Sequence, residues 1–247
     1  MNRRWPLYAG ATLLGSAVLV MPALLLGSSA LASAAPPLLF PASAVVFAVP
    51  TSRPLVALTI DDGPSNATSE LLELLEEHEA HATFFAIGEH LAQAPELAGQ
   101  IVASGHELAH HMTTDAPSIR LPAERFRTDF DRMDAQLAQL GGAKLFRPGS
   151  GWFNDRMVAH ATARGYQVVL GSVYPFDAII PSAAFHAWFI RRNVRAGAII
   201  VLHEGGSRGR RTVDVLRDVL PELRRRGYRV VTVSELLRAA DPVAGAG

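Results

Sequence analysis

Two adjacent carboxylates stand directly after an apolar run of the sequence. Asp61 and Asp62 follow the segment Leu55–Ile60, and a Gly-Pro pair stops the chain after them. One such aspartate commonly caps the next helix, which leaves the second carboxylate unexplained. Two carboxylates held together favour a bound cation, or a division of roles in which one is a ligand and the other a base.

Histidines and a further aspartate follow a second short apolar segment. This cluster contains His106, His110, His111 and Asp115. A helical turn would bring His111 and Asp115 to one face, because they are four residues apart, and with Asp62 they could hold one metal ion. We expect His106 and His110 to pack in the core or to support the ligands.

Two other segments could take part in the same chemistry. The loop Phe146–Trp152 contains Arg147 and two glycines, and its free backbone N–H groups could face a developing oxyanion. A plain Pro-Gly turn explains the same residues. His203 follows the apolar run Ile199–Leu202 directly, so it would be the fourth polar group presented at one end of a sheet.

The elements predicted around these residues explain why they would meet. From residue 55 onward, short β-branched runs alternate with amphipathic segments, which is typical of repeating βα units. The sequence predicts strands at 55–60, 82–87, 107–109, 145–146, 167–170, 198–202 and 229–233, and helices at 69–80, 94–104, 122–140, 154–164, 183–192 and 212–226. Ser234 is expected to cap a last short helix. We expect an α/β fold, an irregular and incomplete (β/α) barrel of about seven βα units, with its chemistry at the strand ends.

The start of the chain predicts export. Arg3 and Arg4 precede a run without charged residues that lasts until Arg53, and Ala11–Leu26 is almost wholly apolar. The small residues Ala30–Ala34 fit a cleavage site, so residues 1–35 are expected to be a signal peptide, or a signal anchor that spans the bilayer if it stays uncleaved. The protein would then be secreted or membrane-anchored, with its domain outside the cytoplasm.

The rest of the chain is predicted to hold one domain. Residues 36–53 contain several prolines and are expected to be a tether with a possible edge strand, 54–240 the domain, and 241–247 a tail. The 23 basic and 23 acidic residues cancel, and the arginine-rich terminal helix is expected to be a solvated face, so we expect no nucleic-acid partner. The absence of cysteine excludes disulfides, thiolate catalysis and sulfur-ligated metal sites.

From about residue 54 to 237, these motifs resemble, in order, those of the polysaccharide deacetylase family, carbohydrate esterase family four. The run Thr59–Pro64 is similar to the family's T-F-D-D-G-P, which implies that Asp61 is the general base and Asp62 a metal ligand. His111 matches the first histidine of H-[ST]-x-x-H, and Asp115 replaces the second. The resemblance implies a divalent ion on these three ligands, and their oxygen-rich chemistry makes manganese or cobalt credible beside zinc.

The remaining motifs imply the other catalytic roles. Arg147–Trp152 resembles the family's loop beside the groove, so Arg147 would orient the base, while the Ser150 backbone N–H and Trp152 would line the oxyanion and substrate side. The family's usual tyrosine is missing there. The motif D-x-x-D-W survives only around Asp177, which must then supply any pairing with Arg147. His203 matches the end of L-x-x-H and inherits the role of general acid.

The resemblance implies a metal-dependent hydrolase of the cell envelope. It would remove N-acetyl groups from an amino-sugar polymer or oligomer, such as chitooligosaccharide or peptidoglycan, and release acetate. The acetylated glycan would be its partner, with the membrane added if the leader stays in place. Two alternatives remain open, a deacylase of a small or lipid-linked substrate and a non-catalytic carbohydrate-binding relic of the fold. Asp61 and His203 argue against the relic, because sugar binding alone needs neither.

Overall fold

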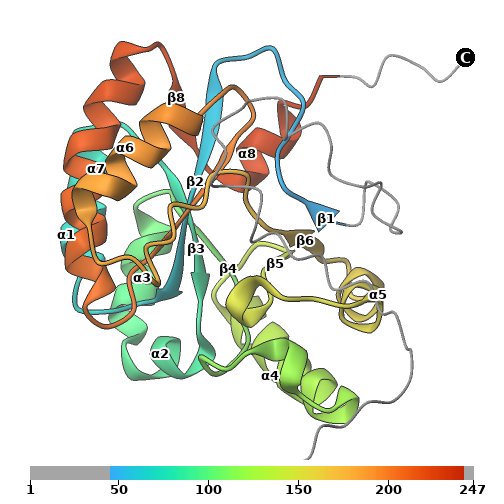
Figure 1. Cartoon of the computed structure of the whole chain (residues 1–247). Coiled ribbons are helices and arrows are strands. Elements are labelled where there is room, and N and C mark those ends of the chain that lie inside the picture. The colour runs from blue at the N-terminus through green and yellow to red at the C-terminus, as the bar shows by residue number, and fades with distance from the viewer. Residues whose placement is uncertain (1–44, 242–247) are drawn as a thin grey trace, which may run out of the picture. The chain divides into compact units, whose positions relative to one another are not determined.

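The computed structural model describes residues 45–241. The predicted leader, the first part of the tether and all but the first residue of the tail lie outside the described residues. The elements, drawn in Figure 1, are β1 Val45–Val46, β2 Leu55–Gly63, α1 Thr68–Glu77, β3 Ala82–Ala86, α2 Gly88–Gln93, α3 Pro95–Ala103, β4 Glu107–His110, α4 Ala123–Gln139, β5 Leu145–Phe146, α5 Asp155–Ala163, β6 Gln167–Val169, α6 Ala183–Asn193, β7 Ile199–His203, α7 Arg208–Arg225, β8 Arg229–Val231 and α8 Val233–Arg238.

The strands form one parallel sheet that is open and irregular. Its order is β1-β6-β5-β4-β3-β2-β7, and β8 pairs with the beginning of β2 off this path. All nine residues of β2 are buried, as expected for a central parallel strand covered on both faces. The predicted α/β fold with an incomplete barrel is therefore confirmed, and β1 pairs with β6 inside the segment expected to supply an edge strand.

Helices cover the sheet in two groups. Figure 1 shows α1, α6 and α7 together on one flank and α4 and α5 on another. Helix α1 buries Leu71, Leu72, Leu74 and Leu75, the spacing of an amphipathic helix facing a core. Within residues 45–241, none of the helices has both the length and the apolar character needed to cross a membrane.

Parallel pairing brings the ends of distant strands to one edge. Asp61 in β2 stands opposite His203 in β7 on one side and opposite Phe85 in β3 on the other. His110, the last residue of β4, pairs with Phe146 of β5, so His111 and Arg147 also leave the sheet side by side. The residues that the sequence placed after separate strands therefore converge.

Several element boundaries differ from the prediction. Helix α2 was not predicted, and α7 begins at Arg208 rather than near residue 212. The last helix is capped by Thr232, whose hydroxyl accepts a hydrogen bond from the backbone of Glu235, so the predicted cap at Ser234 is wrong. Threonine serves this function because it lies just before the first helical residue.

Candidate active site

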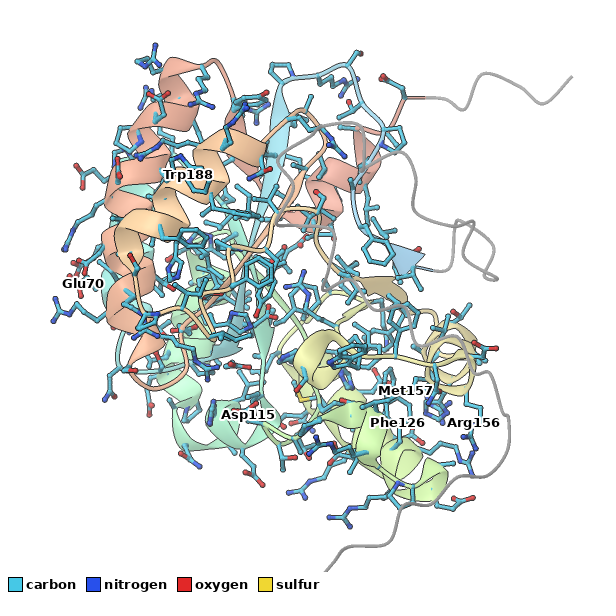
Figure 2. The ribbon with its side chains drawn as sticks, viewed as in Figure 1. Glu70, Asp115, Phe126, Arg156, Met157 and Trp188 are labelled. Atoms are coloured by element: carbon cyan, nitrogen blue, oxygen red, sulfur yellow. The ribbon has the colours of Figure 1, made fainter. Side chains whose placement is uncertain are left out.

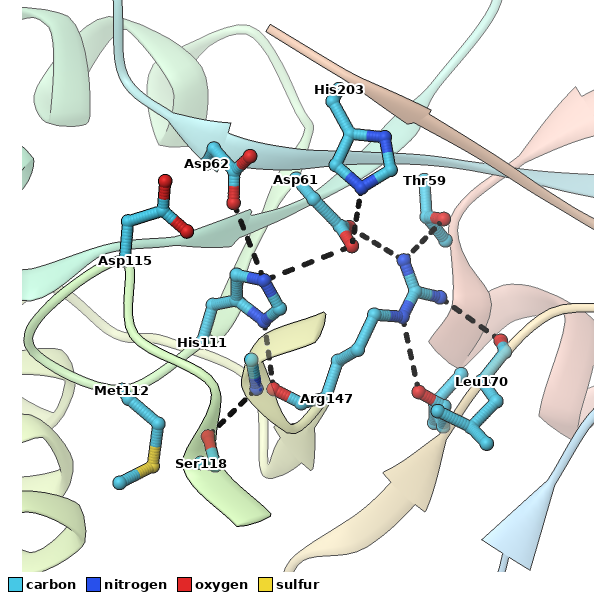
Figure 3. A network of polar contacts seen from close by, with 12 residues as sticks. Thr59, Asp61, Asp62, His111, Met112, Asp115, Ser118, Arg147, Leu170 and His203 are labelled. Atoms are coloured by element: carbon cyan, nitrogen blue, oxygen red, sulfur yellow. Dashed lines mark hydrogen bonds and ion pairs between the residues drawn. The ribbon is translucent and has the colours of Figure 1, made fainter. Parts of the chain in front are cut away.

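Asp61 lies at the centre of a buried polar network. Its side chain is almost wholly buried, and its Oδ2 atom lies 3.9 Å from Nε2 of His111 and 3.9 Å from Nε2 of His203 (Figure 3). The other oxygen, Oδ1, accepts a hydrogen bond of 2.6 Å from Nη1 of Arg147. The carboxylate therefore has one oxygen fixed by arginine and one facing two imidazoles.

Arg147 is held by four acceptors and by an aromatic ring. Besides Asp61, its guanidinium donates to the hydroxyl of Thr59 at 2.7 Å and to the carbonyls of Val169 and Leu170 at 3.1 and 3.0 Å. Its Cζ atom lies 4.1 Å from the centre of the Phe85 ring, within cation–π range. A buried guanidinium with this many partners has one orientation, and it fixes that of Asp61.

Asp177 supports His203 and does not contact Arg147. Its two carboxylate oxygens accept hydrogen bonds from the backbone N–H of His203 at 2.8 Å and from the ring Nδ1 at 2.9 Å. The predicted pairing of Asp177 with Arg147 is therefore wrong, because the guanidinium already has its acceptors from β2 and from the end of β6. The contact fixes the His203 tautomer, since Nδ1 donates and Nε2 is left to face Asp61.

The carboxylates favour the charged form of His203. Burial alone would lower the pKa of this imidazole, but the hydrogen bond to Asp177 and the charges of Asp177, Asp61 and Asp62 raise the pKa above its ordinary value. An imidazolium held in this way can donate a proton from Nε2.

Asp62 and His111 form a second pair beside Asp61. Nδ1 of His111 donates to the carbonyl oxygen of Arg147 at 2.7 Å, and Nε2 lies 3.4 Å from Oδ1 of Asp62. Burial alone would lower the pKa of His111, but its contact with Asp62 and the charges of Asp61 and Asp62 raise that pKa above its ordinary value. Asp62 adopts a left-handed backbone conformation with φ of 69°, and its carbonyl accepts a hydrogen bond from His90. Although burial opposes it, contacts with His111, His203 and Arg208 lower the pKa of Asp62 well below its usual range.

Asp115 stands apart from this pair. The segment after β4 is a loop in which Met112 has a φ of 71°, so the helical turn expected to align His111 with Asp115 is absent from it. The Asp115 side chain is 62% exposed, and its Oδ2 atom lies 3.9 Å from Nη2 of Arg208. Figure 2 labels Asp115 within the whole molecule, and the close-up in Figure 3 draws no dashed line from it to His111 or Asp62.

The donor set fits a divalent ion at two of its three predicted positions. Asp62 offers a carboxylate oxygen and His111 an imidazole nitrogen, both ligands that zinc, cobalt and manganese accept. No group of three His, Asp or Glu side chains among residues 45–241 is arranged closely enough to hold an ion as it stands. Asp115 would have to turn away from Arg208 to complete the set.

The predicted substrate loop lies at the surface. Ser150 is exposed with a φ of 64°, and Trp152 is 42% exposed. Within residues 45–241, no hydrogen bond joins either residue to the network around Asp61. The Tyr174 ring lies 6.0 Å from that of His203, and burial with the neighbouring carboxylates raises its pKa to about 12, so the hydroxyl stays protonated.

His106 and His110 are structural residues, as expected. His110 is fully buried against the rings of Phe130, Phe146 and Tyr166, and burial lowers its pKa to about 3. Sequence patterns did not predict three further partners of the site, Thr59, His90 and Arg208. Thr59 lies in the same motif as Asp61 and could have been found there, whereas nothing local to His90 or Arg208 signals their contacts.

Comparisons with known proteins show which family the sequence resembles. The polysaccharide deacetylase domain model matches residues 48–169. A peptidoglycan-N-acetylglucosamine deacetylase of Bacillus cereus is 36% identical over 204 residues, covering 80% of this chain and 95% of that protein. A chitooligosaccharide deacetylase of a Bradyrhizobium species is 32% identical over 197 residues, covering 73% and 90%.

Solved structures show the same architecture. The crystal structure of a peptidoglycan N-acetylglucosamine deacetylase superposes with a TM-score of 0.75 at 27% identity, over 81% of this chain and 96% of the other. A mutant of a CE4 family pseudoenzyme, in which enzymatic activity was restored, superposes with a TM-score of 0.73 at 26% identity, over 81% and 73%. The chain therefore belongs to the polysaccharide deacetylase family, carbohydrate esterase family four.

Proposed function

We propose that this protein hydrolyses N-acetyl groups of an amino-sugar polymer or oligomer in a metal-dependent reaction that releases acetate. The observation that supports this most directly is the position of Asp61, whose free oxygen lies 3.9 Å from both His111 and His203. A base between a metal-ligand candidate and a proton donor is the arrangement that amide hydrolysis needs. The similar proteins named above as peptidoglycan and chitooligosaccharide deacetylases support the substrate class.

The proposed reaction uses two proton transfers. Asp61 accepts a proton from water, and the resulting hydroxide adds to the acetamide carbonyl carbon. His203 then donates its Nε2 proton to the amide nitrogen as the C–N bond breaks, so that acetate and a free amine leave. Arg147 orients Asp61 and Asp177 orients His203, each through the hydrogen bonds described above. In this reaction the backbone N–H of Ser150 is proposed to donate a hydrogen bond to the oxyanion, and Trp152 to lie beside the substrate.

The proposed ion would be held by Asp62, His111 and Asp115. Zinc, cobalt and manganese all suit two carboxylates and one imidazole. When bound, the ion would polarise the carbonyl and lower the pKa of water from about 15.7 towards neutrality. His111 would keep its present tautomer, because its Nδ1 is committed to the Arg147 carbonyl.

Acetate release tests the proposal. The purified protein is incubated with chitooligosaccharides, peptidoglycan and other acetylated glycans, with and without a chelator, and acetate is measured. Chelation should abolish release, and adding back a divalent ion should restore it. If no substrate yields acetate from the metal-loaded protein, the proposed hydrolase function is wrong.

Replacing Asp115 by alanine should sharply reduce the amount of bound metal. The substitution removes one of three ligands from an exposed position, so the fold should be unaffected. Metal content after dialysis is measured by atomic emission, with Asp155→Ala, an exposed position at the start of helix α5, as a control. A full metal complement together with full turnover in Asp115→Ala would show that Asp115 is no ligand.

We also propose that the first 35 residues carry the domain across a membrane. The basic start and the uncharged run before Arg53 support this. A reporter enzyme that is active only outside the cytoplasm, fused after residue 247, is expected to be active. The same junction is made with a reporter that works only in the cytoplasm, and activity of that second fusion would contradict export.

A non-catalytic carbohydrate-binding protein is the second candidate function. Two observations favour it: Asp115 contacts Arg208, and no three-ligand group exists among residues 45–241. The buried pairs Asp61–Arg147 and Asp177–His203 favour the enzyme, because sugar binding does not require them. Glycan binding without acetate release, measured on the metal-loaded protein, would identify the binding protein.

A further inference from the structure

Arg208 turns back from the start of α7 into the predicted metal site. Its Nη2 atom lies 3.0 Å from Oδ2 of Asp62 and 3.9 Å from Oδ2 of Asp115. Its Nε atom donates to the carbonyl oxygen of Gly205 at 2.9 Å. With three oxygen partners and a side chain only 25% exposed, the guanidinium occupies a defined position between the two carboxylates.

Gly205 leaves room for this guanidinium. A Cβ atom at residue 205 would lie 2.7 Å from Nη2 of Arg208 and 3.0 Å from Cβ of Asp62. Any larger residue would push the guanidinium away from Asp62. The backbone at this point therefore permits the close contact between Arg208 and the predicted ligand.

Arg208 and the predicted ion would bind the same two carboxylates, those of Asp62 and Asp115. Oδ1 of Asp62 lies 3.4 Å from Nε2 of His111, whereas Oδ2 is paired with Arg208. Among residues 45–241, the ion pair of Asp115 is with Arg208. A second cation entering the site would meet the repulsion of the guanidinium, and it would lack its third ligand while Asp115 stays with Arg208.

We propose that Arg208 competes with the divalent ion. Arg208 stays paired with Asp115 until the arginine side chain withdraws. The inference rests on the proposed function, because it takes the existence of the ion from it. It assigns Asp115 two alternating partners, the guanidinium of Arg208 and the ion. The protein would then bind its metal less tightly than the same three ligands would without Arg208. It would also exchange the bound ion more readily.

Calorimetric titration of the metal-stripped full-length protein with Mn²⁺ tests this inference, with Zn²⁺ and Co²⁺ titrated afterwards. Arg208→Gln should lower the Kd for Mn²⁺ by about tenfold or more, because a repelling charge is removed and Asp115 is released. Arg208→Met should behave in the same way if the glutamine variant folds poorly. Arg210→Gln is the matched control, since Arg210 lies on the same helix, is 72% exposed and faces Glu70.

A double-mutant cycle separates competition for Asp115 from general repulsion. In an Asp115→Asn background, the tightening caused by Arg208→Gln should be much smaller, because no third ligand is left to release. An unchanged or higher Kd in Arg208→Gln would overturn the inference. Equal tightening in both backgrounds, or in Arg210→Gln, would also overturn it.

Acetate release by the metal-loaded wild type is recorded in parallel. Release of acetate without tighter binding in Arg208→Gln contradicts only the competition and leaves the proposed function intact. If neither the wild type nor Arg208→Gln binds any of the three ions, the competition and the proposed metal dependence both fail.

Discussion

Replacing Asp61 by asparagine should lower kcat by a factor of about 10²–10⁴, the usual contribution of a positioned general base. Asparagine keeps an oxygen that can accept the hydrogen bond from Arg147, so the buried guanidinium retains a partner. An alanine at this position would leave the charge of Arg147 without a hydrogen-bond acceptor from residue 61. A fall in kcat could then not be separated from a loss of folding stability. Substrate binding should change little, because Asp61 acts mainly in the transition state.

The measurement is steady-state acetate release over a range of pH. Loss of the base should flatten the acidic limb of the rate profile, while thermal melting and metal content stay close to those of the wild type. Asp131→Asn is a suitable control, because Asp131 is a half-exposed aspartate paired with Arg164. Unchanged acetate release in Asp61→Asn would remove this residue from the mechanism.

His203→Ala should cause a loss of similar size, about 10²–10⁴ in kcat, through the missing proton donor. Here the alkaline limb of the rate profile should flatten, because that limb reports deprotonation of the acid. The raised pKa of His203 places this limb above the ordinary range for histidine. His78→Ala, at the end of α1, is the matched control, and full activity of His203→Ala would exclude a general-acid role.

Asp177→Asn refines the same prediction. An amide at this position keeps one oxygen, enough for one of the two hydrogen bonds that Asp177 accepts from His203, and it removes the negative charge that favours the imidazolium. The pKa of His203 should fall, so the alkaline limb should move to lower pH, and kcat should drop less than in His203→Ala. An alkaline limb at the wild-type position would show that the charge of Asp177 does not govern this histidine.

The convergence of the site could be predicted because it depends on strand order. Parallel strands present their carboxyl ends at one edge, so residues after each apolar run had to come together. The partner of Asp177 could not be predicted in this way. Asp177 lies in the irregular segment between β6 and α6, and whether such a loop reaches Arg147 or His203 depends on tertiary packing.

The predicted geometry around Asp115 failed for a local reason. Spacing of four residues aligns side chains only on a helix, and the left-handed conformation of Met112 prevents a helix there. Arginines near a terminal helix are typical of a solvated face, and Arg208 precedes the helix predicted at 212–226. Its contacts with Asp62 and Asp115 depend on the early start of α7 and on the missing side chain of Gly205, neither of which local pattern reveals.

The contacts of Arg147 have a consequence for the shape of the sheet. Thr59 and Asp61 belong to β2, whereas the carbonyls of Val169 and Leu170 belong to the end of β6, with β3, β4 and β5 between them in the sheet. The Arg147 side chain can reach both strands because the sheet curves, so its guanidinium connects β2 to the end of β6. The same bonds that aim the carboxylate therefore also tie two strands that are not neighbours in the sheet. Lysine, with its single ammonium group, cannot make this set of bonds, so Arg147→Lys would loosen this connection and the orientation of Asp61 together.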